Sequence, residues 1–135
     1  NAVYSEHFIE HLTKDEGIEY FKEMFRVMKP GGIIRSVWPP MDFVDFLRTD
    51  EDLTNHPFVQ QYFRVYIQKH KFAPEGTEHL SPQLQCAEGL LWQGGEHKHL
   101  WYKKELKETL VELDTPGQIR MLHSAVVEAA KPWSM

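Results

Sequence analysis

The chain has 135 residues, a formal net charge of −5, and ordinary shares of apolar (41%) and charged (26%) residues, which indicates one globular domain. The acidic balance argues against a nucleic-acid partner, because phosphate binding requires a basic surface. No apolar run reaches membrane-spanning length, no basic-then-apolar leader is present, and the single cysteine, Cys86, fits a reducing compartment. We therefore expect a cytoplasmic protein that binds neither nucleic acid nor a membrane.

The first 40 residues predict a strand, a helix and a second strand. The apolar run at 2–4 would end a buried strand, and a capping box that starts at Thr13 opens a helix with apolar positions every three or four residues. The sequence KPGG ends this helix, because proline cannot continue it and glycine adopts positive φ angles. Residues 33–38 then predict a strand, which Pro39 and Pro40 close.

The middle of the chain predicts a helical insertion at about residues 41–95. Short helices are expected at 43–47 and 84–91, and a longer helix from Pro57 to about Lys69. Prolines and glycines on either side of the last short helix predict loops there.

The end of the chain predicts a helix and two strands. Residues 103–114 carry leucines at helical spacing, whereas 119–122 and 125–129 are strand candidates, antiparallel across a tight turn at 123–124. The alternation of strands and helices predicts a mostly parallel sheet with an antiparallel finish.

The sequence HFIEH at residues 7–11 matches the H-x-x-E-H motif of one class of zinc peptidases. His7 and His11 would bind zinc and Glu10 would be the base, provided that all three share one helix face. A third ligand would then be needed downstream, and Glu75, Glu78 and Glu88 are the candidates for it. His97 and His99 are a second candidate pair, because two residues that lie two apart on a strand project from one face. Because His7 follows a strand and the next clear helix begins at Thr13, we expect this helical geometry to fail and no metal to bind. Glu10 would then be an exposed first-turn acid, or have a role in chemistry.

Two longer stretches resemble the centre of a class I, Rossmann-like SAM-dependent methyltransferase. VYSEHFIEHL, from residue 3, is similar to the end of that family's fourth strand, and RVMKPGGIIRSVWPP, from residue 26, is similar to its next helix and fifth strand. EHKHLWYKKELKETL and SAVVEAAKP resemble the segment before the last helix and the closing strand. The resemblance covers roughly half of the chain and points to small predicted methyltransferases of unassigned substrate. It implies a partial Rossmann-like sheet, equivalent to strands 4 to 7, with a helical insertion.

The resemblance also implies a cofactor and a set of site residues. In that family the residues just after the fourth strand border the methionine part of SAM, so Ser5, Glu6 and His7 become cofactor-side candidates. His7 or His11 would be the catalytic base, and the candidates for the substrate side are Pro39, Pro40, His97 and Tyr102. The methyl acceptor stays open, although the aromatic residues of the insertion suggest an apolar or ring-bearing molecule.

The chain departs from the family in one respect. It contains no G-x-G-x-x-G loop, and the resemblance places the family's SAM-binding glycine loop and its ribose-binding acid upstream of Asn1. We therefore expect the C-terminal half of a methyltransferase domain, inactive alone, whose exposed N-terminal strand edge pairs with a second copy in a homodimer. Two alternatives stay open: a zinc-dependent hydrolase that uses His7, Glu10 and His11, and a non-catalytic remnant.

Overall fold

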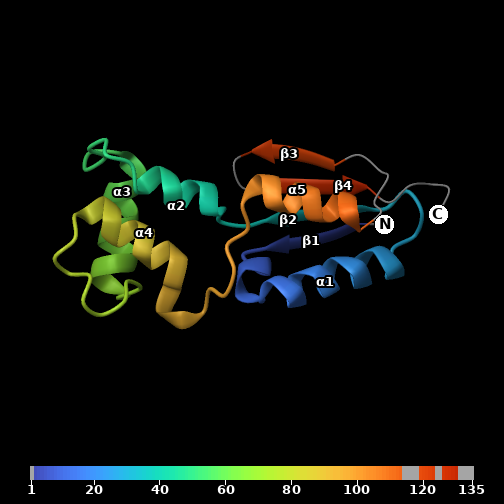
Figure 1. The fold of residues 1–135 in the computed structure, drawn as a ribbon, viewed down its shortest axis with the longest axis horizontal. Coiled ribbons are helices and arrows are strands. Elements are labelled where there is room, and N and C mark those ends of the chain that lie inside the picture. The colour runs from blue at the N-terminus through green and yellow to red at the C-terminus, as the bar shows by residue number, and fades with distance from the viewer. Residues whose placement is uncertain (1, 114–118, 124–125, 131–135) are drawn as a thin grey trace. The chain divides into compact units, whose positions relative to one another are not determined.

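The computed structural model describes residues 2–113, 119–123 and 126–130 (Figure 1). The chain divides into two compact units, one made of Asn1–Pro40 with His99–Met135 and the other of Met41–Lys98. The first unit contains the strands, and the second is helical. None of the helices in the described part of the chain has the length and apolar character that a membrane span requires.

The sheet of the first unit has the strand order β1-β2-β4-β3. β1 (Ala2–Glu6) and β2 (Ile33–Val37) pair in parallel, whereas β4 (Val126–Ala130) pairs antiparallel with both β2 and β3 (Ile119–His123). The predicted antiparallel pairing of the last two strands is confirmed. Their predicted turn at 123–124 lies partly outside the described residues.

The predicted fold class, a mostly parallel Rossmann-like sheet, is wrong. Only one pair among the described strands is parallel, and helices account for more of the described chain than strands do. Antiparallel pairing dominates because β4 lies between β2 and β3 and pairs antiparallel with each of them. A strand pattern in the sequence predicts that a strand forms, but it does not specify which neighbours that strand takes.

Helix α1 (Lys14–Val27) begins at the predicted capping box. The Thr13 hydroxyl accepts a hydrogen bond from the Glu16 amide over 3.2 Å, and the Glu16 carboxylate accepts one from the Thr13 amide over 2.9 Å. The helix ends before Pro30, and Gly31 adopts a φ of 82° in the turn toward β2. The sequence prediction for both ends of this helix is confirmed.

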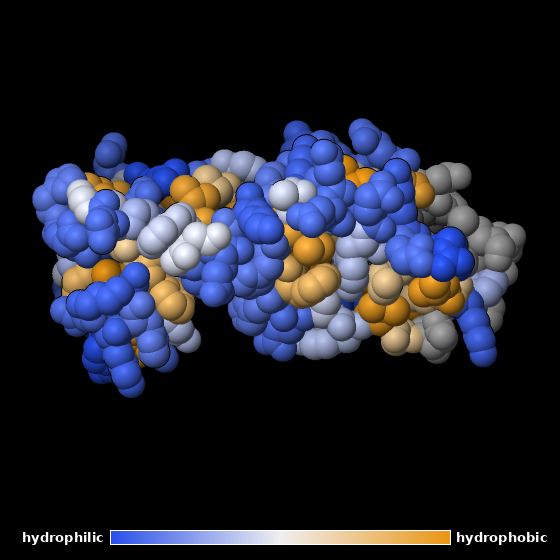
Figure 2. All heavy atoms as spheres, turned by 90° about the horizontal axis from the view of Figure 1, so that it is seen from below, coloured by the Kyte–Doolittle hydropathy of each residue, from blue (hydrophilic) through white to orange (hydrophobic). Residues whose placement is uncertain are grey.

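Helix α1 and helix α5 (Lys103–Glu112) contribute to the core of the first unit (Figure 1). The buried apolar residues of this core are Ile9, Phe21, Met28, Ile34, Trp38, Trp101, Leu106 and Leu110. Gly17 of α1 allows Trp101 to approach closely, because a Cβ atom at Gly17 would lie 3.1 Å from the indole ring. Apolar side chains also reach the surface around α1, as Figure 2 shows in orange.

The second unit consists of helices and the loops between them. Its elements are α2 (Met41–Leu47), α3 (Pro57–Tyr62), the π-helix η2 (Phe63–Lys69), α4 (Pro82–Trp92) and the 3-10 helix η3 (Gln93–Gly95). Helix α3 starts at the predicted position, because the His56 ring accepts a hydrogen bond from the Phe58 amide over 3.2 Å. Its continuation as a π-helix was not indicated by the apolar spacing.

Gln83 of α4 connects that helix to the loop after α2. Its side-chain oxygen accepts a hydrogen bond from the Leu53 amide over 2.6 Å. Its side-chain nitrogen donates to the carbonyl oxygens of Leu47 (3.1 Å) and Glu51 (3.0 Å), with a longer contact to that of Thr49 (3.4 Å). This buried amide therefore satisfies backbone groups that no helix or strand serves.

Candidate functional site

The carboxyl ends of β1 and β2 lie side by side at one edge of the sheet, and the HFIEH segment follows β1 there. The His7 amide donates a hydrogen bond to the Val37 carbonyl oxygen over 3.0 Å, which extends the parallel pairing past the end of β1. His7 adopts a φ of 52°, a left-handed conformation that is uncommon for a residue other than glycine. This turn directs the chain out of the sheet and into the 3-10 helix η1 (Ile9–His11).

His7 and His11 do not share the helix face that an H-x-x-E-H zinc site requires. His7 lies in the turn before η1, and only Ile9–His11 are helical before α1 begins. The prediction that the helical geometry fails is therefore confirmed. In this segment the Glu10 carboxylate instead lies close to the imidazoles of His7 and His11.

Glu10 carries a carboxylate that is fully buried. Its exposed fraction is 0%, and neither oxygen accepts a hydrogen bond in the described part of the chain. Oε1 lies 3.8 Å from His7 Nδ1 and 3.8 Å from His11 Nε2. Burial raises the pKa of the Glu10 carboxyl above its ordinary value, because the charged form loses its hydration, and the polar backbone amide of Glu10 and the nearby imidazoles oppose this only in part. The interpretation of Glu10 as an exposed first-turn acid is wrong.

The two histidines connect this buried carboxylate to the surface. The His7 side chain is 67% exposed and the His11 side chain is 32% exposed. Each ring nitrogen is 3.8 Å from the carboxylate oxygen, so a proton would pass between Glu10 and either imidazole through a bridging water rather than directly. The edge thus combines one desolvated acid with two accessible bases.

The other two cofactor-side candidates lie within β1 rather than beyond its end. The predicted strand end at residue 4 is too early, because β1 continues through Glu6. The Ser5 hydroxyl forms a hydrogen bond of 2.9 Å with the hydroxyl of Ser36 on β2. The Glu6 carboxylate accepts a hydrogen bond from the Tyr4 hydroxyl over 3.0 Å and lies 3.9 Å from the His7 ring. Ser5 is therefore engaged inside the sheet, and Glu6 stays exposed at its edge.

A network that the sequence reasoning missed holds this segment against the start of α5. The His99 amide donates to the Glu10 carbonyl oxygen over 3.3 Å, and His99 Nε2 lies 3.1 Å from Glu105 Oε1. Lys14 Nζ pairs with the other Glu105 oxygen over 3.1 Å. Burial opposes ionisation of Glu105, but its contacts with Lys14 and His99 outweigh burial and lower the pKa of this carboxyl. The one local signal is the spacing of Tyr102 and Glu105, whose carboxylate accepts from the Tyr102 amide over 3.2 Å.

The substrate-side candidates are divided between the two units. Pro39, half-buried, and Pro40, buried, end the first segment of the first unit, and Tyr102 is exposed beside α5 in the same unit. His97 belongs to the second unit, where its Nδ1 is hydrogen-bonded to the Leu90 carbonyl oxygen.

Cys86 has the surroundings of a packing residue rather than a nucleophile. It is fully buried, and its Sγ lies 3.7 Å from the Val59 carbonyl oxygen. Burial raises the pKa of the thiol to about 12, so the reactive thiolate is not populated near neutral pH. Among the acids considered as an additional zinc ligand, Glu88 forms an ion pair with Arg48 over 2.9 Å.

No protein-family model matches the chain, and a comparison with curated proteins finds no match either. The chemistry of this edge therefore has to be inferred from its own residues.

Proposed function

We propose that the chain serves a SAM-dependent methyltransferase and that the edge formed by Ser5, Glu6, His7, Glu10 and His11 borders the methionine part of the cofactor. One structural observation supports this proposal. The parallel pairing of β1 with β2 brings the two stretches that resemble the family, 3–12 and 26–39, together at a shared strand end. Ligands of α/β proteins commonly bind beyond the carboxyl ends of parallel strands.

The residues at this edge fit a cofactor with positive charge. SAM carries a sulfonium and an α-ammonium group, and Glu10 offers a buried carboxylate whose oxygens accept no hydrogen bond in the described part of the chain. Glu6 adds a second, exposed carboxylate. A cation next to Glu10 would stabilise its charged form and so compensate for the cost of its desolvation. When bound, SAM supplies the methyl group.

His7 and His11 would act on the acceptor. Methyl transfer depends mainly on positioning, but a hydroxyl or amine acceptor also needs to lose a proton. His7 is the better candidate for this base because its ring is the more exposed of the two. Since the chain contains no glycine-rich phosphate or nucleotide loop, the edge would supply only part of a cofactor site, and we expect weak binding by this chain alone.

The test is an NMR titration of the isotope-labelled chain with S-adenosylhomocysteine, the reaction product. We expect the amide of His7 and the imidazole signals of His7 and His11 to shift at millimolar ligand, with the exposed His79 ring as an unshifted reference. Adenosine alone should cause smaller shifts, because the edge is proposed to contact the methionine part. If the folded chain shows no shift at this edge, the proposal fails.

The variant Glu10→Gln tests whether the charge of Glu10 contributes to the binding of a positively charged ligand. SAM carries one positive charge more than S-adenosylhomocysteine, so the native chain should favour SAM, and the variant should lose that preference. Glu19→Gln, an exposed substitution on α1, is the matched control and should keep it. An unchanged preference in Glu10→Gln would remove Glu10 from the proposed site.

The proposal also includes the assembly and location of the protein. β1 is at one edge of the described sheet, and we propose that a second copy pairs with it to give a homodimer. Light scattering at micromolar concentration should then give twice the mass of one chain, and a monomer would contradict the proposal.

The unpaired, buried Cys86 supports a cytoplasmic location. The zinc-hydrolase alternative is not supported in the form predicted from the sequence, because the helix face that the H-x-x-E-H motif needs is not formed.

A further inference from the structure

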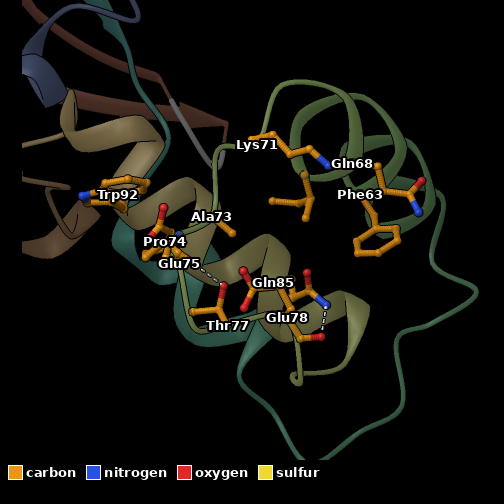
Figure 3. Close-up of a pocket in the computed structure, with 11 residues that line it drawn as sticks. Phe63, Gln68, Lys71, Ala73, Pro74, Glu75, Thr77, Glu78, Gln85 and Trp92 are labelled. Atoms are coloured by element: carbon orange, nitrogen blue, oxygen red, sulfur yellow. Dashed lines mark hydrogen bonds between the residues drawn. The ribbon is translucent and has the colours of Figure 1, made fainter.

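A cavity of about 500 Å³ lies within the second unit, among η2, the loop at 73–78 and α4 (Figure 3). Its volume falls in the range of roughly 300–1,000 Å³ that is typical of small-molecule sites. The residues that line it are Phe63, Ile67, Gln68, Lys71, Ala73, Pro74, Glu75, Thr77, Glu78, Gln85 and Trp92. No residue of the proposed cofactor edge belongs to this set, so the inference drawn from it is independent of the proposed function.

The π-helix η2 supplies one wall of the cavity. The amide of His70 donates to the Val65 carbonyl oxygen over 3.1 Å, the wider spacing that defines a π-helix. Phe63 and Ile67 of η2 line the cavity, and Ile67 packs against α4 because Gly89 has no side chain there. A Cβ atom at Gly89 would lie 2.5 Å from Ile67 Cδ1. π-helices are rare and frequently occur at functional sites.

Charged groups of opposite sign line the cavity without pairing with each other. Figure 3 shows Lys71 on the side of η2 and Glu75 and Glu78 across from it. No ion pair joins Lys71 to a carboxylate within the part of the chain that the structure describes. Lys71 is held with a φ of 57°, and Glu78 is fixed by the Gly76 amide, which donates to its carboxylate over 3.0 Å.

We propose that this cavity binds a small zwitterionic molecule with an apolar ring, that is, an aromatic amino acid or a molecule of the same chemistry. The ligand's carboxylate would lie near Lys71, its ammonium group near Glu75 and Glu78, and its ring against Phe63 and Ile67. Such a ligand pairs with both charges at once. Because Lys71, Glu75 and Glu78 are exposed, solvent screens each pair, and the preference for a zwitterion comes from the two pairs acting together. The aromatic wall adds ring contacts of defined geometry.

Three ligands with one phenyl group test the charge requirement. L-Phenylalanine is zwitterionic, phenethylamine is a cation, and 3-phenylpropionate is an anion. Trp92 lines the cavity and is 40% exposed, so its emission reports binding, and the ligand-dependent signal should vanish in Trp92→Phe. We expect saturable binding of L-phenylalanine, and binding of each singly charged ligand that is weaker by about threefold, which corresponds to about 0.6 kcal/mol.

Two variants then identify the charges. Lys71→Gln should weaken the binding of L-phenylalanine about threefold and leave that of phenethylamine unchanged, whereas Glu75→Gln should weaken the binding of phenethylamine and leave that of 3-phenylpropionate unchanged. Lys69→Gln and Glu51→Gln are exposed controls outside the cavity lining and should change nothing. Unfolding midpoints of all variants show whether each one is folded. Absence of saturable binding, equal affinity for the three ligands, or insensitivity to both variants would each overturn the proposal.

Discussion

Each unit contains a long polar side chain that is buried completely or nearly so, Gln83 in one and Glu10 in the other, and the two are hydrogen-bonded to opposite extents. Gln83 in the helical unit is 6% exposed, and both ends of its amide are used in hydrogen bonds to backbone groups. Glu10 in the unit that contains the sheet is 0% exposed, and its carboxylate accepts no hydrogen bond from the described residues. The first arrangement stabilises the fold, whereas the second costs stability.

This difference separates structural polar residues from candidates for function. A buried polar group that is fully hydrogen-bonded is accounted for by its contribution to the stability of the fold. A buried carboxylate without hydrogen bonds lowers that stability, and unfavourable groups of this kind are concentrated at functional sites. Substitutions at both positions can test whether the contrast is real.

The largest effect is expected for Gln83→Met. Methionine has a similar size but cannot hydrogen-bond to the Leu53 amide or to the carbonyl oxygens of Leu47 and Glu51. We expect the free energy of unfolding in urea to fall by about 3 kcal/mol, because these buried backbone groups lose their partner. Gln61→Ala, an exposed control on α3, should change it by less than about 0.5 kcal/mol. A small loss of stability in Gln83→Met would mean that water satisfies the backbone groups of the loop after α2 when the Gln83 amide is absent.

A smaller effect of opposite sign is expected for Glu10→Met. Burial raises the pKa of Glu10 in the folded state above its value in the unfolded chain. Below the unfolded-state pKa, the Glu10 carboxyl is protonated in both the folded and the unfolded chain. As pH rises through the two pKa values, Glu10 ionises more readily in the unfolded chain, so the native protein loses stability, whereas the variant does not. Glu10→Met should therefore be more stable by about 1 kcal/mol at neutral pH, and the gain should shrink as pH falls through the raised pKa of folded Glu10 and be smallest below about pH 4.

Urea unfolding at several pH values measures this difference. Glu19→Met on the exposed surface of α1 is the control, since its carboxylate is solvated in both states. If Glu10→Met lowers stability as much as Gln83→Met does, Glu10 is a structural residue and the contrast between the units disappears.

The smallest effect is expected at Glu105. Its pKa is lowered in the folded state by Lys14 and His99 despite burial, so its charge contributes stability above its unfolded pKa, and this stability is lost as pH falls through the folded pKa. Because the Glu105 side chain is 25% exposed and that of Lys14 is 50% exposed, a double-mutant cycle of Glu105→Gln with Lys14→Met should give a coupling of only about 0.5 kcal/mol. A coupling several times larger would make this ion pair a main anchor of the HFIEH segment.

Local signals in the sequence predicted the parts of the fold that depend on neighbouring residues. The capping box at Thr13 and the turn at Gly31 were predicted because each needs only a few adjacent residues. Strand pairing was predicted less well, because β4 takes its place between β2 and β3 through contacts that are distant in the chain. For the same reason the fold class could not be obtained from the alternation of strands and helices.

The sequence motif drew together the residues of the candidate site, and the failure of its helical geometry was predicted, but the burial of Glu10 was not. His7, Glu10 and His11 attracted attention through a motif that the structure does not form. Glu10 has a contact from much later in the chain, because the His99 amide donates a hydrogen bond to its backbone carbonyl oxygen. Spacing within HFIEH cannot report a contact of that kind, and neither can it report the π-helix that shapes the cavity of the second unit.

The π-helix η2 has a consequence for variation in chain length. An i to i+5 hydrogen bond encloses one residue more than the α-helical pattern does, so the removal of a single residue within Phe63–Lys69 would convert this segment into a regular α-helix. The helix would survive, but the side chains after the deletion would rotate by about 100° relative to those before it. Relatives of this protein that lack one residue here would therefore keep the fold of the second unit and present a differently lined cavity, with Lys71 displaced from Glu75.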